Sequence, residues 1–155
     1  MENKRNDLFA LLILLVLLTA VPTIVQSEST GKLIVNISGF PSSEGFAMVA
    51  LHNSEQSYQA EGTGAVDAKK VPVIDQKTQV VFENLAFGSY GVALYHDENA
   101  NGKLDTNDLG IPKEAYGFSN NARGFFGKPA YKDVMFQMNS TEMEISIDIE
   151  QDFTM

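Results

Sequence analysis

The stretch 82-FENLAFGSYGVALYHD-97 decides the fold, because it reads as a strand, a tight turn and a longer strand. In the longer strand, apolar side chains alternate between two faces, one with Tyr90, Val92 and Leu94 and the other with Gly91, Ala93 and Tyr95. A two-residue period is typical of a β-strand with both faces in use. This segment therefore predicts two consecutive strands of a β domain.

Outward from this segment, further short strands are predicted at 32–38, 46–52, 68–74, 78–82, 134–138 and 143–149. The nearly continuous apolar run 46–52 predicts a central strand, and Pro72 places 68–74 at an edge. We expect 32–38 and 46–52 to pair as a hairpin. After residue 27 no helical apolar period extends over ten positions, so the sequence predicts an all-β, single two-sheet antiparallel sandwich of about seven strands.

Residues 98–131 form a stretch without a sustained strand or helix pattern, longer than the usual connection in a compact domain. It contains five glycines together with leucine, isoleucine, tyrosine and phenylalanine residues. This composition is too apolar for a disordered tail. We predict one long ordered loop that folds back over the sandwich and needs an internal organiser.

The N-terminal sequence predicts that the protein is exported. Lys4 and Arg5 precede an apolar run at 8–21, as in a secretory signal peptide over residues 1–27, with residues 28–155 as the domain. A retained anchor is the alternative, although Pro22 interrupts the run before the roughly 20 residues of a spanning helix. We expect a periplasmic or extracellular bacterial protein with no stable membrane anchor after cleavage. Its net charge of −9 argues against nucleic acid as a partner, and without Cys it has no disulfides.

The organiser of the long loop is predicted to be 97-DENANGKLDTND-108, which has the twelve-residue spacing of a calcium loop. Short oxygen-bearing side chains on alternate residues can point inward as the backbone curls, and glycine permits the sharp turn at position 6. The predicted ligands are the side chains of Asp97, Asn99, Asn101, Asp105 and Asp108 and the carbonyl of Lys103. We expect calcium with an affinity of about 10⁻⁴ to 10⁻³ M. A plain Asx turn without an ion is the alternative, but it leaves the acids at positions 1, 9 and 12 unexplained.

These motifs resemble a bacterial domain-of-unknown-function family of small exported β-sandwich proteins. The similarity is carried by the segments 85–90, 95–99, 102–107, 109–114 and 116–124, including a D-x-N-x-N-G-x-L-D loop and a Y-G-F-S-N-N segment. The resemblance implies a signal peptide and a prealbumin-like or immunoglobulin-like sandwich, and no established activity. Ala100 and Asp108 depart from the family pattern, where Gly and Phe are frequent.

Two further sets of residues are candidate sites. His52 and His96 each end a predicted strand and, if neighbours, could hold zinc or copper with Asp97, although a hydrogen-bonded strand-end histidine is the simpler interpretation. An aromatic and amide surface for a sugar or peptide could be formed by Tyr116, Phe118, Asn120, Asn121 and Arg123. The simpler interpretation of this second set is that its aromatic rings close the sandwich and its amides bind the backbone of the loop.

We therefore expect a calcium-stabilised, non-enzymatic binding or structural module of the bacterial envelope, with an envelope protein or a glycan as candidate partner. No Cys and no Gly-x-Ser-x-Gly motif is present to supply a nucleophile. The alternatives are a carbohydrate- or peptide-binding module that uses residues 116–126, and a metal-dependent hydrolase that uses His52 and His96.

Overall fold

The computed structural model describes residues 29–60, 63–125 and 127–149. Its elements in chain order are β1 (Thr30–Ser38), β2 (Phe46–His52), α1 (Glu55–Gln59), β3 (Asp67–Pro72), β4 (Lys77–Ala86), β5 (Gly88–Asp97), β6 (Tyr116–Phe118), the 3₁₀ turn η1 (Ser119–Asn121), α2 (Tyr131–Val134), β7 (Phe136–Met138) and β8 (Glu142–Asp148). The predicted signal peptide lies outside the described residues. Within them, no helix is long and apolar enough to cross a membrane.

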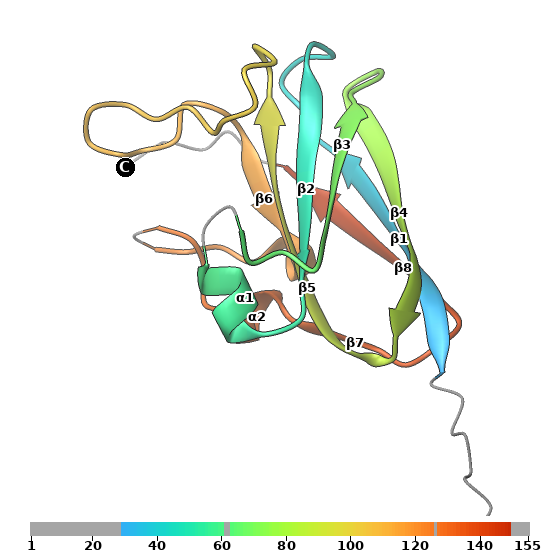
Figure 1. The fold of residues 1–155 in the computed structure, drawn as a ribbon. Helices are drawn as coiled ribbons and strands as arrows, with labels where there is room; N and C mark the ends of the chain where they lie inside the picture. Colours follow the sequence, from blue (N-terminus) through green and yellow to red (C-terminus); the bar gives the residue numbers. More distant parts are fainter. Residues whose placement is uncertain (1–28, 61–62, 126, 150–155) are drawn as a thin grey trace, which may run out of the picture.

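The predicted two-sheet sandwich is confirmed (Figure 1). Among the described residues, one sheet has three strands in the order β4-β1-β8, and the other has five, in the order β3-β2-β5-β6 with β7 also paired to β5. As predicted, β2 is central in its sheet and β3 is at an edge. The short helices α1 and α2 lie toward one end of the larger sheet, and the loop that follows β5 leaves the opposite end (Figure 1).

The core lies between the two sheets and follows from strand alternation. On β1, Leu33, Val35 and Ile37 are at most 1% exposed and pack with buried residues of the facing sheet such as Val49 and Val92. Full burial of each such side chain contributes about 1.5–3 kcal/mol of transfer free energy. Without disulfides, this apolar layer holds the two sheets together.

The predicted hairpin between 32–38 and 46–52 is wrong. β1 pairs with β4 and β8, whereas β2 pairs with β3 and β5 in the other sheet. The connection through Gly39 and Pro41 therefore crosses between the sheets and does not fold back within one. Apolar alternation fixes which face of a strand is buried, but it does not choose the neighbouring strand.

Two other expectations need correction. The sandwich is not antiparallel throughout, because β1 and β8 run parallel from Lys32↔Glu142 to Ser38↔Asp148. The stretch 98–131 is not without a strand, because β6 lies within it and pairs with β5. A strand of three residues is too short to show a periodic pattern in the sequence.

Candidate functional site

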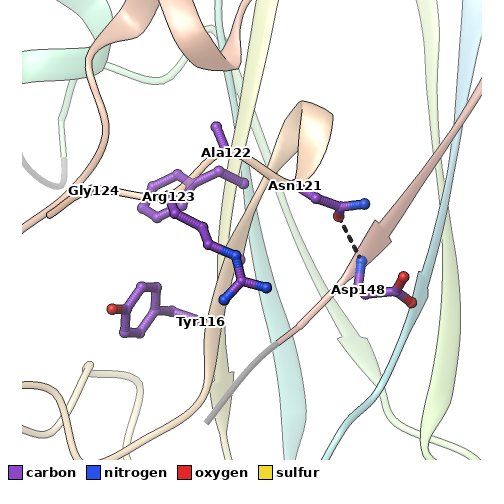
Figure 2. A pocket seen from close by; sticks show the side chains of 8 residues that line it. Tyr116, Asn121, Ala122, Arg123, Gly124 and Asp148 are labelled. Atoms are coloured by element: carbon purple, nitrogen blue, oxygen red, sulfur yellow. Dashed lines mark hydrogen bonds between the residues drawn. The ribbon is translucent and has the colours of Figure 1, made fainter. Parts of the chain in front are cut away.

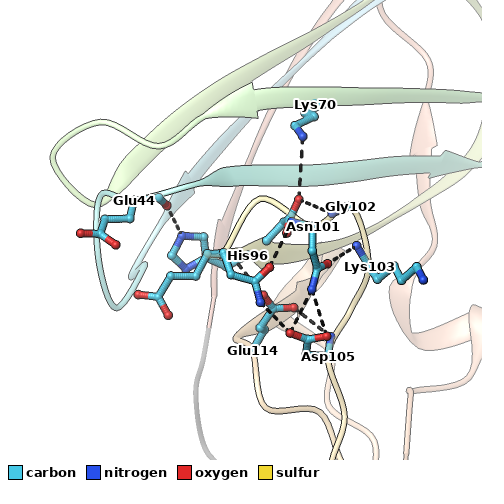
Figure 3. Close-up of polar contacts among 11 residues, drawn as sticks. Glu44, Lys70, His96, Asn101, Gly102, Lys103, Asp105 and Glu114 are labelled. Carbon is cyan, nitrogen blue, oxygen red and sulfur yellow. Dashed lines mark hydrogen bonds and ion pairs between the residues drawn. The ribbon is translucent and has the colours of Figure 1, made fainter.

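Asp97 is the last residue of β5 and the first of the predicted calcium loop. Its side chain is fully buried, its Oδ2 atom accepts the Gly102 N–H at 3.0 Å, and the Lys70 ammonium lies 3.9 Å from the same oxygen. Dashed lines at Gly102 and Lys70 in Figure 3 mark these two contacts. Its Oδ1 atom is buried and has no hydrogen-bond partner among the described residues. Buried carboxylate oxygens are normally paired, because desolvation without a partner costs several kcal/mol. An unpaired oxygen at this position is one that a cation would satisfy.

The side-chain oxygens of Asn99 and Asn101 accept hydrogen bonds from backbone N–H groups of the loop. Asn99 Oδ1 accepts the Asn101 N–H at 3.0 Å, and Asn101 Oδ1 accepts the Lys103 N–H at 2.8 Å. Both amide nitrogens donate to Asp105, at 2.7 Å from Asn99 and at 3.1 and 3.2 Å from Asn101. These are the Asx turns of the ion-free interpretation, and the hydrogen bonds to Asp105 bring Asn99, Asn101 and Asp105 together. Figure 3 shows Asn101 beside Asp105. Coordination of a cation there requires the two amides to turn their oxygens inward.

Glu114 is a site residue that the sequence analysis missed. It is 8% exposed, its Oε1 accepts the Glu98 N–H at 3.2 Å, and its Oε2 accepts the Asp105 N–H at 2.9 Å. The chain returns to the loop because the Lys113 N–H donates to the carbonyl of Asp105 at 2.7 Å. The carboxylate that closes the loop in the structure thus comes from outside the twelve-residue window. The spacing of residues 97–108 therefore could not predict the role of Glu114.

Asp108, predicted to close the ion shell, is exposed. It lies in a turn where Asn107 Oδ1 accepts the N–H groups of Leu109 and Ile111 at 2.9 and 3.0 Å. Among the described residues, no three side chains of His, Asp or Glu come together closely enough to hold a metal by themselves. A cation at this loop therefore needs amide and carbonyl oxygens, including that of Lys103, beside its carboxylates.

The structure does not bring His52 and His96 together. His52 pairs with Gly91 at one end of β2 and β5, and His96 pairs with Ala47 at the other. A five-residue offset along a strand is about 16 Å. His52 is beside Ser57, with Nδ1 and Oγ 3.1 Å apart, whereas His96 Nε2 lies 2.7 Å from the carbonyl of Glu44. Each imidazole thus has a different hydrogen-bond partner, and the two rings are too far apart to share a zinc or copper ion.

The residues of the predicted aromatic and amide surface are divided between two roles. The buried Phe118 packs with Tyr58, Tyr131 and Val134, and thereby closes one end of the sheet. Asn120 Nδ2 donates to the carbonyls of Asp133 and Met135, each at 3.0 Å. These contacts are those of the simpler interpretation, in which the rings and amides serve the fold.

The other members of that surface line a small cavity. Figure 2 shows the Arg123 side chain between Tyr116 and Asp148. These residues line a cavity of about 110 Å³. Asn121, beside it, accepts the Asp148 N–H at 2.9 Å. A cavity of this size is below the range of about 300–1,000 Å³ that is usual for small-molecule sites.

Comparison with known proteins places the chain in a family. The family model DUF2141, described as an uncharacterized protein conserved in bacteria, matches residues 35–146. The chain belongs to DUF2141. The match runs from β1 into β8 and includes the loop 97–108 and Glu114, so the candidate site lies within the family domain. No curated protein and no solved structure matches the chain of this DUF2141 member.

Proposed function

We propose that this DUF2141 protein is exported to the bacterial envelope and acts there as a calcium-stabilised, non-enzymatic binding or structural module. The observation that carries the proposal is the buried Asp97 carboxylate, whose Oδ1 atom has no hydrogen-bond partner. It stands at the start of a loop with calcium-loop spacing, next to the gathered Asn99, Asn101 and Asp105. A hard divalent cation prefers such oxygens.

The role of the ion follows from the position of the loop. Asp97 ends β5, and residues 98–115 return to the sheet where the carbonyl of Ala115 accepts the His96 N–H at 2.8 Å. A cation held by Asp97 and Asp105 links the end of the strand to the returning chain. Because the assembled oxygens exist only in the folded state, the binding free energy adds to the stability of the fold.

Thermal unfolding of the purified protein tests this proposal. At about 5 mM calcium, an affinity of about 10⁻⁴ to 10⁻³ M raises the free energy of unfolding by about 1–2 kcal/mol relative to chelator. For a domain of this size we expect the melting temperature to rise by about 4–10 °C. Magnesium at the same concentration should have a smaller effect, because it demands a stricter octahedral shell.

The variants Asp97→Asn and Asp105→Asn should each remove the calcium effect. Asp133→Asn, at an exposed aspartate of α2 outside the loop, is the matched control and should keep it. Asp108→Asn shows whether the exposed acid at position 12 contributes. Equal melting temperatures of the unmodified protein in calcium and in chelator would disprove the proposal.

A further inference from the structure

The outer face of the larger sheet carries a groove whose floor is formed by strands, and residues of the cation loop border it at one end. Alternation directs Ala47, Val49 and Leu51 of β2 into the core, so Met48, Ala50 and His52 face outward. In the strand register, Ala68 of β3, Ala50 of β2 and Ala93 of β5 lie side by side, followed by Phe118 of β6. Three alanines in one row leave a shallow trough across the strands, because their neighbours are much larger.

Larger side chains flank the alanine row. On one side, Tyr95 of β5 pairs with Met48 of β2 and Tyr116 of β6. Leu104, Thr106 and Pro112 from the loop after β5 add to the wall at this end. On the other side are His52 and Tyr58, whose rings are 5.5 Å apart and nearly perpendicular. The whole groove encloses about 990 Å³, at the upper end of the range for small-molecule sites.

The charge of the groove differs from that of the protein. The chain has 20 acidic and 11 basic residues. The described residues that line the groove include Lys69 and Lys128 and no acidic residue. The Lys69 ammonium pairs with Asp67 at 3.2 Å and lies 5.8 Å from the ring centre of the core residue Phe82, so it is engaged elsewhere. Among the described residues that line the groove, Lys128 is therefore the cation left for a ligand.

Lys128 stands at the aromatic end of the groove. Its Nζ atom lies 4.3 Å from the ring centre of Tyr58 and donates to the carbonyl of Tyr58 at 2.6 Å. An ammonium has three N–H donors, and this carbonyl uses one of them. Burial, and to a smaller extent the charge of Lys128, lowers the pKa of the neighbouring His52. This end of the groove thus presents a positive charge beside apolar walls.

We propose that the groove binds a monomeric single-chain amphiphile with one anionic head group, such as a fatty-acid-like carboxylate. The head group pairs with Lys128, and the apolar chain lies along Ala50, Ala93 and Ala68. Burial of the chain supplies the affinity, and the ammonium selects the sign of the head group. The inference goes beyond the calcium proposal, because strands β2, β3 and β5 form the floor of the groove with or without an ion.

Calorimetric titration of the full protein with decanoate and with decyltrimethylammonium tests the proposal, since the two probes share a chain length and differ in charge. Below their micelle concentrations, we expect decanoate to bind one-to-one with a dissociation constant of about 10⁻⁵ to 10⁻⁴ M. The cationic probe should bind at least about fivefold more weakly. Absence of decanoate binding, or equal binding of both probes, would overturn the proposal.

Variants of the groove separate its charge from its shape. Lys128→Gln should weaken decanoate binding by about fivefold and leave binding of the cationic probe unreduced. Lys132→Gln, which removes the same charge from an exposed position of α2 outside the groove, is the matched control and should bind as the unmodified protein does. An equal loss in both lysine variants would contradict the assignment of the head group.

Ala50→Leu fills the trough and should abolish decanoate binding. The melting temperature of the variant checks that it is folded. Ala93→Leu is the second variant of the same kind. Unchanged affinity in a folded filling variant would also overturn the proposal. Each titration is run in calcium and in chelator. Decanoate binding in chelator supports the groove even where calcium has no effect on stability, so failure of either proposal is recognised separately.

Discussion

At the scale of single residues, the candidate site shows that the position of a carboxylate in the fold decides what it does. Asp97 and Asp108 are both acids of the twelve-residue loop, yet Asp97 is fully buried and Asp108 is exposed. Only the buried one has a desolvated oxygen, so only there does a cation relieve a large cost. Glu114, absent from the motif, is nearly as buried as Asp97 and holds two backbone N–H groups.

Replacement of Glu114 tests its part in the loop. Glu114→Ala leaves the N–H groups of Glu98 and Asp105 without their acceptor, which should lower the free energy of unfolding by about 1–3 kcal/mol in urea titrations. Glu114→Gln retains one acceptor oxygen and should lose less. Glu83→Ala, at an exposed site on β4, is the control and should stay within about 0.5 kcal/mol of the unmodified protein. An alanine variant at position 114 as stable as this control would contradict the assignment.

The stability of the protein should depend on pH through His52. Burial lowers the pKa of its imidazole from the ordinary value of 6.5. As the pH falls below 6.5, the unfolded chain takes up a proton at this residue before the folded chain does, so the free energy of unfolding decreases. Once the pH is below the folded-state pKa, both states carry the proton, and His52 no longer changes the free energy of unfolding with pH.

His52→Gln, which can keep a hydrogen bond to Ser57, should lose less stability than the unmodified protein between pH 7.5 and pH 5. Melting temperatures across this interval, taken in chelator so that calcium binding does not contribute, provide the measurement. Parallel curves for the two proteins would rule out a contribution from His52.

At the scale of elements, the turn before β2 and the end of β5 are packed against each other. Gly45 has φ +67°, and a Cβ atom on it would lie 2.0 Å from the carbonyl oxygen of Asp97. The conformation and the close approach both require glycine. The turn therefore fixes the backbone of Asp97, on which the candidate site depends.

Gly45→Ala and Gly110→Ala form a matched pair that separates this contact from conformational strain. Gly110 also has a positive φ, +77°, but nothing lies within 4 Å of a Cβ atom there. Gly110→Ala should cost about 1–2 kcal/mol, the strain of the left-handed backbone. Gly45→Ala should cost more in thermal unfolding, and should also reduce the calcium-induced rise in melting temperature. Equal losses in the two variants would show that the approach to Asp97 is unimportant.

At the scale of the whole molecule, a two-sheet sandwich carries the loop after β5 at one end and two short helices toward the other (Figure 1). The loop follows β5, which is a strand of the five-stranded sheet and not of the three-stranded sheet β4-β1-β8. We therefore expect the three-stranded sheet and the loop to respond differently to the proposed ion.

Hydrogen exchange can resolve this separate response. Calcium should slow amide exchange within residues 97–114, because under our proposal the ion links Asp97 to the returning chain and raises the free energy of local opening. Amides of β1, β4 and β8 that exchange by local opening should be unaffected, and they serve as the internal control. Mass spectrometry of peptides from the two regions, with calcium and with chelator, provides the comparison. Uniform slowing of both regions, or of neither, would contradict a local role for the loop.

The sequence by itself determined the longer strands, their buried faces and the calcium-loop spacing, because these depend on neighbours within a few residues. Alternation along 82–97 predicted β4 and β5, and Pro72 correctly predicted an edge strand. Only the tertiary structure decided that β1 pairs with β4 and β8 and not with β2, that His52 and His96 lie apart, and that Glu114 returns to the loop. These contacts join residues from 9 to more than 100 positions apart, and local periodicity contains no information about which distant segments meet.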